Sequence, residues 1–113
     1  HDKMRGHLYE NFIVMEALKS QLNDGRESNL YFYRDSNGNE IDLLVPRNGE
    51  LTGIEIKSAM TYSYDFQKTL IKMPEYVKEP IRQRGVVYTG EMENFTSDIK
   101  ILNYKHLNDL LKL

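Results

Sequence analysis

Two short stretches of sequence decide the fold: residues 40–45 read Glu-Ile-Asp-Leu-Leu-Val, and residues 54–57 read Ile-Glu-Ile-Lys. Charged and aliphatic side chains alternate in both stretches, which is the period of a β-strand with two different faces. Residues 46–49 between them, Pro-Arg-Asn-Gly, have the composition of a tight turn. The sequence therefore predicts two neighbouring antiparallel strands, over residues 40–45 and 51–58.

Strict alternation also predicts which side chains share a face. On the first strand, Asp42 is expected beside Glu40 and Leu44. The opposite face is expected to carry the aliphatic residues Ile41, Leu43 and Val45. On the second strand, Glu55 and Lys57 are expected to share one face. Charges on a central strand of a small domain are costly unless they are paired or bind a metal, so this face is the candidate functional site.

The rest of the chain extends these two strands into a larger sheet. An aromatic run at residues 30–34 is followed by an Asn-Gly pair, which is typical of a hairpin. A strand that follows a strand and a helix normally joins the sheet in parallel, so the sheet should be mixed. Further elements are expected as helices over residues 4–22, 62–78 and 105–112 and strands over residues 30–34, 85–89 and 98–104. The order α-β-β-β-α-β-β-α predicts an α/β (α+β) domain with helices on both faces of the sheet.

Length and composition bound the class of protein. The chain has 113 residues, 40% of them hydrophobic and 28% charged, so residues 1–113 are expected to form a single domain. No apolar run approaches the roughly 18 residues of a membrane span, so no membrane partner is expected. Cysteine is absent, which excludes disulfides and thiolate sites and fits a location in the cytoplasm. A net charge of −2 gives no general attraction to nucleic acid, so such a partner would need a local basic surface.

The charged residues of the two strands form a recognisable chemical set. Asp42 and Glu55 could hold Mg²⁺ or Mn²⁺ through carboxylate oxygens, with the backbone carbonyl of Ile56 as a third ligand. Lys57 could orient an attacking water or stabilise charge on a phosphate oxygen. Glu10, on the first helix, could reach the same cluster as an outer metal ligand or as a water-orienting base. A plain alternative is a cross-strand network of ion pairs on a solvated face.

The order of elements and these residues resemble the PD-(D/E)XK phosphodiesterase superfamily, which has a restriction-endonuclease-like fold with an αβββαβ core. Glu55 and Lys57 match the (D/E)-x-K motif, and Asp42 matches the acid that precedes it. Glu10 matches a helix acid found in many members, including archaeal Holliday-junction resolvases. Ile41 stands where the nominal motif has proline, a position that varies within the superfamily.

A more specific resemblance covers most of the chain. The strings at residues 6–12, 31–35, 39–44 and 54–58 are similar to a domain of unknown function at the C-terminus of many bacterial and archaeal AAA+ ATPases. This resemblance implies an N-terminal ATPase domain in the full-length chain, of which the present sequence would be a C-terminal fragment. The sequence itself has no Gly-rich phosphate-binding loop. RecB-like members add Gln-x-x-x-Tyr after the lysine, but here Gln67 is followed by Ile71 at that spacing.

The leading functional hypothesis is a divalent-metal-dependent nuclease that hydrolyses nucleic-acid phosphodiesters, with DNA favoured and either endo- or exonuclease action open. Its catalytic residues would be Glu10, Asp42, Glu55 and Lys57. Arg34, Lys68 and Lys72 are candidate phosphate contacts, although solvated surface charge explains them equally well.

Two alternatives stay open. The first is a catalytically inactive module of an AAA+ ATPase that binds nucleic acid or protein, which the acidic balance of charge favours. The second is an oligomerisation module, in which the chain would form a homo-oligomer through aromatic residues that otherwise cap the local core. Those aromatic residues are Tyr62, Tyr64, Tyr76 and Tyr104.

Overall fold

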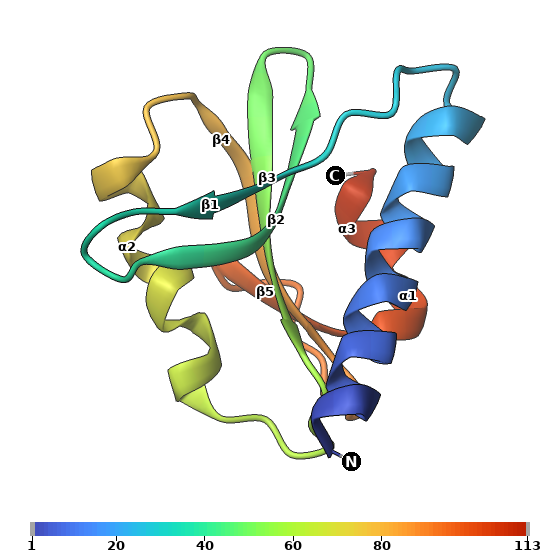
Figure 1. Cartoon of the computed structure of the whole chain (residues 1–113), viewed down its shortest axis with the longest axis vertical. Helices are drawn as coiled ribbons and strands as arrows, with labels where there is room; N and C mark the ends of the chain where they lie inside the picture. Colours follow the sequence, from blue (N-terminus) through green and yellow to red (C-terminus); the bar gives the residue numbers. More distant parts are fainter. Residues whose placement is uncertain (1, 113) are drawn as a thin grey trace.

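The computed structural model describes residues 2–112 and contains all eight predicted helices and strands in the predicted order (Figure 1). The elements are α1 (Asp2–Asn23), β1 (Tyr31–Arg34), β2 (Glu40–Arg47), β3 (Glu50–Lys57), the 3-10 turn η1 (Tyr64–Gln67), α2 (Lys68–Tyr76), β4 (Ile81–Tyr88), β5 (Ile99–Asn103), the 3-10 turn η2 (Tyr104–His106) and α3 (Leu107–Leu111).

The five strands form one mixed sheet in the order β1-β2-β3-β4-β5. Neighbours are antiparallel from β1 to β3 and parallel from β3 to β5, so β3 is the central strand, as predicted. Helices α1 and α3 cover one face of the sheet and α2 covers the other (Figure 1). The predicted α+β class, with a mixed sheet flanked by helices on both faces, is confirmed.

Each face of the sheet has its own hydrophobic cluster. Ile13 and Ala17 of α1 are fully buried on one face, and Leu70 and Met73 of α2 are fully buried on the other. Burial of each large aliphatic side chain contributes roughly 1.5–3 kcal/mol. A Cβ atom at Gly53 would lie 2.6 Å from the Met73 sulfur, so this glycine lets α2 pack closely on the centre of the sheet.

Strict alternation along β2 breaks at Asp42. Ile41 packs with Leu44 on the α2 side of the sheet, whereas Leu43 and Val45 pack on the α1 side. The prediction that Ile41 shares a face with Leu43 and Val45 is therefore wrong. The register of the β1–β2 pairing shifts by one residue at this point, because β2 contains an extra residue relative to β1. Such a bulge re-aims the side chains around it, here next to the candidate site.

Other predicted boundaries also differ from the structure. Pro46 and Arg47, expected in a turn, extend β2 and pair with Leu51 and Glu50. Strand β4 begins at Ile81 rather than at Gly85, because Ile81, Gln83 and Arg84 pair with β3 in parallel. The predicted helix over residues 62–78 is shorter, and it starts as the 3-10 turn η1 before α2 begins at Lys68. Pro74 lies inside α2.

Most of the tyrosines named above as a potential interface lie against the domain's own core. Tyr76 stacks on Tyr33 with ring centroids 4.7 Å apart, and Tyr62 packs edge-on against Tyr88 at 5.8 Å. Tyr104 makes edge contacts with two aromatic rings of α1. The fourth residue, Tyr64, is exposed. These contacts account for three of the four without an oligomer.

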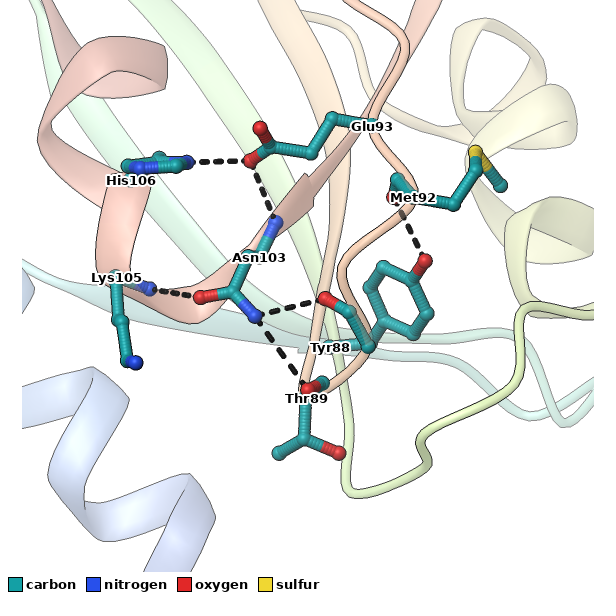
Figure 2. A network of polar contacts seen from close by, with 8 residues as sticks. Tyr88, Thr89, Met92, Glu93, Asn103, Lys105 and His106 are labelled. Carbon is teal, nitrogen blue, oxygen red and sulfur yellow. Dashed lines mark hydrogen bonds and ion pairs between the residues drawn. The ribbon is translucent and has the colours of Figure 1, made fainter.

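A buried asparagine organises the chain after β4 (Figure 2). The Asn103 side-chain amide donates to the Gly90 carbonyl at 2.7 Å, and its oxygen accepts the Lys105 N–H at 2.9 Å, which caps η2. The Asn103 backbone N–H donates to the Glu93 carboxylate, which also contacts His106. These bonds fix the loop between β4 and β5 against the end of the sheet.

Candidate functional site

Strands β2 and β3 separate at the candidate site, and two carboxylates replace the missing ladder bonds. The β2–β3 pairing ends with Leu43 opposite Ile54. Beyond that pair, the Asp42 backbone N–H donates to Glu55 Oε1 at 3.2 Å, and the Ile56 backbone N–H donates to Asp42 Oδ2 at 2.8 Å. The two acids predicted as metal ligands are therefore neighbours, and each is held by the backbone of the other strand.

Both carboxylates lie in an environment that disfavours their charge. Glu55 is only 5% exposed. Burial, together with repulsion from Asp42, raises the pKa of Glu55 to about 7. Burial also raises the pKa of Asp42, against the opposing effects of the Ile56 N–H and of Lys57. The folded chain thus holds two acidic groups that gain from a shared proton or from a cation.

Lys57 supplies the nearest positive charge. Its Nζ lies 3.8 Å from Glu55 Oε2 and 5.7 Å from the centroid of the Phe66 ring. The lysine side chain is 37% exposed, so it stands between the buried acid and solvent. Lys57 and Glu55 share the α2 side of β3, as the alternation predicted.

Glu10 reaches the site from the other side of the sheet. It lines a cleft of about 420 Å³ between α1 and the β1–β2 ribbon, together with Asp42 and Ile56. Glu55 and Lys57 are not among the residues that line this cleft. The four predicted residues therefore divide into two groups, one on each side of β3. Asp42 lines the cleft with Glu10, and its backbone N–H donates to Glu55.

The carboxylates of Asp42 and Glu55 could bind a divalent cation, but they supply only part of its coordination shell. Among residues 2–112, no three His, Cys, Asp or Glu side chains are grouped so as to hold a metal ion. Mg²⁺ needs only one or two carboxylates and keeps several waters, so the pair Asp42–Glu55 meets that need. A dication would also remove the repulsion that raises the pKa of Glu55. Mg²⁺ or Mn²⁺ therefore fits this pair chemically.

The predicted phosphate contacts occupy different places. Arg34 lines the cleft and makes an exposed ion pair with Glu40 at 3.0 Å. Lys68 makes an exposed ion pair with Asp65 at 3.4 Å, and Lys72 is exposed on α2. Only Arg34 is thus placed beside Asp42.

Sequence reasoning missed one residue that acts on the site. The Thr69 hydroxyl of α2 hydrogen-bonds to Glu55 and lowers its pKa, against the stronger effect of burial. The signal was present in the spacing, because Thr69 precedes Met73 by one helical turn and Met73 faces the sheet. Gln67, also discussed above, donates to the Tyr62 hydroxyl at 2.6 Å.

Comparison with known families places the chain. A family model described as a domain of unknown function, DUF4143, matches residues 5–107. The chain belongs to the DUF4143 family. This is the C-terminal domain family of AAA-type ATPases. The DUF4143 match runs from α1 to the first residue of α3, so it includes Glu10, Asp42, Glu55 and Lys57.

Other comparisons add little to the DUF4143 assignment. No curated protein and no solved structure matches the chain. Within the described part of the chain, no helix has the length and apolarity needed to cross a membrane.

Proposed function

We propose that this DUF4143 domain is a divalent-metal-dependent nuclease that hydrolyses nucleic-acid phosphodiesters, with DNA favoured. One observation carries the proposal: Asp42 and Glu55 meet where β2 leaves β3, with Lys57 Nζ 3.8 Å from Glu55. The resemblance to PD-(D/E)XK phosphodiesterases supports the assignment, since the αβββαβ order and the Glu55-x-Lys57 spacing are both present.

In this proposal each residue has a separate role. Asp42, Glu55 and the Ile56 carbonyl would hold Mg²⁺ or Mn²⁺, which would polarise a phosphate oxygen. Lys57 stabilises the negative charge that develops on the phosphate. Glu10 lies across the cleft from Asp42, where it orients a water and accepts its proton. The water oxygen bonds to phosphorus as the bond to the leaving sugar oxygen breaks, and that oxygen takes up a proton.

A second candidate function also has an observation in its favour. Asp42 and Glu55 each accept a backbone N–H, so they can serve as structural substitutes for ladder bonds with no metal. Such a domain would be an inactive module of an AAA+ ATPase that binds nucleic acid or protein. For both candidates we propose that the domain acts in the cytoplasm, beside an N-terminal ATPase domain of the same chain.

A cleavage assay separates the two candidates. Purified protein is incubated with single-stranded, duplex and branched DNA in Mg²⁺ or Mn²⁺, with and without EDTA. The nuclease proposal expects metal-dependent products, lost in Asp42→Asn and reduced about 100-fold or more in Lys57→Gln. Glu16→Gln is the matched control, because Glu16 is a carboxylate on the same helix as Glu10 that pairs with Lys19 and does not line the cleft.

Two outcomes would contradict cleavage by this site. Products that persist in Asp42→Asn would come from a contaminating nuclease. Metal-independent binding of DNA without products, equal in the wild type and in Asp42→Asn, would favour the inactive module.

A further inference from the structure

A second cluster of charges lies at the opposite ends of the parallel strands. Where β4 and β5 begin, a cavity of about 350 Å³ is lined by three cationic side chains, Arg82, Arg84 and Lys100. Asp98 is the one acidic residue among those that line it. The other lining residues are Pro74, Ile81 and Gln83. We refer to this cavity as the basic notch.

Arg84 is the most unusual member of the notch, because it is on a strand paired on both sides. Its Cα lies opposite Gly53 of β3 and Ile99 of β5. Its Nη1 donates to the Leu70 carbonyl of α2 at 2.7 Å. A guanidinium has five N–H donors, and a carbonyl is a neutral acceptor, so this bond orients the group without cancelling its charge.

Lys100 also donates to a neutral backbone carbonyl, whereas Arg82 is paired with a carboxylate. Lys100 Nζ donates to the Ser97 carbonyl at 2.7 Å. Arg82 Nη1 lies 3.1 Å from Glu50 Oε1, which is an ion pair. Within residues 2–112, neither Arg84 nor Lys100 has a carboxylate at ion-pair distance. The notch therefore holds two positive charges, on Arg84 and Lys100, that have no carboxylate partner. Backbone carbonyls orient both side chains.

We propose that the basic notch binds a phosphate group. Arginine presents a planar fork that matches phosphate oxygens, and a lysine ammonium adds a point charge. A bound dianion would neutralise the charges of Arg84 and Lys100. The inference does not depend on the proposed nuclease activity, because none of the notch residues belongs to the Asp42–Glu55 site. The phosphate could belong to a nucleic-acid backbone or to a small molecule, since the recognising chemistry is the same.

The test uses inorganic phosphate as the probe. Amide chemical shifts of ¹⁵N-labelled protein are followed in phosphate and, at matched ionic strength, in chloride. Phosphate-specific shifts are expected at residues 81–84 and 98–100. Arg84→Gln and Lys100→Gln should each weaken binding about tenfold, the usual effect of losing one charge-assisted hydrogen bond.

Two further variants distinguish loss of the phosphate site from loss of the fold. Arg47 Nη1 donates to the Leu111 carbonyl at 2.9 Å, as Arg84 does to Leu70, but Arg47 does not line the notch. Arg47→Gln should leave phosphate binding unchanged. Asp98→Asn should tighten it, because this exposed carboxylate repels an anion, and a damaged fold cannot produce that result.

Two results would overturn the inference. One is the absence of phosphate-specific shifts at the notch in the folded wild type. The other is phosphate binding that Arg84→Gln, Lys100→Gln and Asp98→Asn all leave unchanged.

A competing oligonucleotide identifies the source of the phosphate. Displacement of phosphate from the notch indicates a backbone phosphate, and undisturbed phosphate shifts indicate a small phosphate ligand. Either result of that competition supports the site.

Discussion

The parallel strands carry acidic side chains near one end and basic side chains near the other. At the C-terminal end of β3, Glu55 is buried beside another acid, and its pKa is raised to about 7. In the N-terminal half of β4, the charged group is the guanidinium of Arg84, which donates to a helix carbonyl. A proton or a cation can neutralise the carboxylates at the acidic end, whereas only an anion can neutralise the guanidinium at the basic end. The difference predicts that only the acidic end responds to pH.

The largest effect is expected at the acidic end. The pKa of Glu55 rises from its ordinary 4.5 to about 7 on folding, so the folded chain binds this proton more tightly than the unfolded chain. Stability of the metal-free protein should then fall as pH rises from about 4.5 to about 7, by on the order of 3 kcal/mol. Glu55→Gln should remove that loss. Urea unfolding in EDTA at pH 4.5 and pH 8 measures it, and equal effects of the substitution at both pH values would contradict it.

The corresponding change at the basic end should act in the other direction. Arg84→Gln loses the bond to the Leu70 carbonyl and should cost about 2 kcal/mol. Because arginine stays charged, the cost should be the same at pH 5 and pH 8. Urea unfolding of Arg84→Gln at the two pH values is the measurement. A cost that varies with pH would break the contrast between the two ends.

Asn103, the last residue of β5, lies outside both charge clusters. Asn103→Ala removes the cap of η2 and the bond to the Gly90 carbonyl (Figure 2). The expected loss of stability is about 1–2 kcal/mol, independent of pH. Thermal unfolding measures the loss, and phosphate binding serves as the control that should not change. A pH-dependent loss would mean that the Asn103 bonds are coupled to a titrating group, such as Glu93 or His106.

The smallest effect concerns the pair Glu93–His106. The hydrogen bond and charge of Glu93 raise the pKa of His106 above its ordinary 6.5, and His106 is exposed. Its contribution to stability is fully present below pH 6.5 and is lost as pH rises through the raised folded-state value. An NMR titration of the His106 ring should show this raised pKa in the wild type and a value near 6.5 in Glu93→Gln. An unchanged titration in the variant would exclude the pair as the cause.

Sequence reasoning was most successful where one local signal determines one element. The alternation around Asp42 and Glu55 predicted two neighbouring strands with charges next to each other, and the strands form as predicted. The same reasoning placed Ile41 on the wrong face, because a bulge depends on how β1 pairs with β2 and leaves no mark in β2 alone.

The basic notch shows the same limit at longer range. The sequence Arg-Gln-Arg at residues 82–84 lies outside the predicted strand over residues 85–89, since it lacks apolar residues. It becomes strand because β3 pairs with it, and Lys100 joins it only through the β4–β5 pairing. Sites built from one hairpin can be predicted from sequence, whereas sites built by crossover pairing need the topology.

A calorimetric titration of Mn²⁺ into the wild type and Glu55→Gln near pH 7, with Glu16→Gln as the control, tests the carboxylate site. Binding by the wild type and the control is expected, accompanied by proton release, because Glu55 is partly protonated near its pKa of about 7. The release is measured by repeating the titration in buffers of different ionisation enthalpy. Loss of binding in Glu55→Gln would establish the carboxylate site. No binding by the folded wild type at millimolar Mn²⁺, or equal binding by Glu55→Gln, would contradict it.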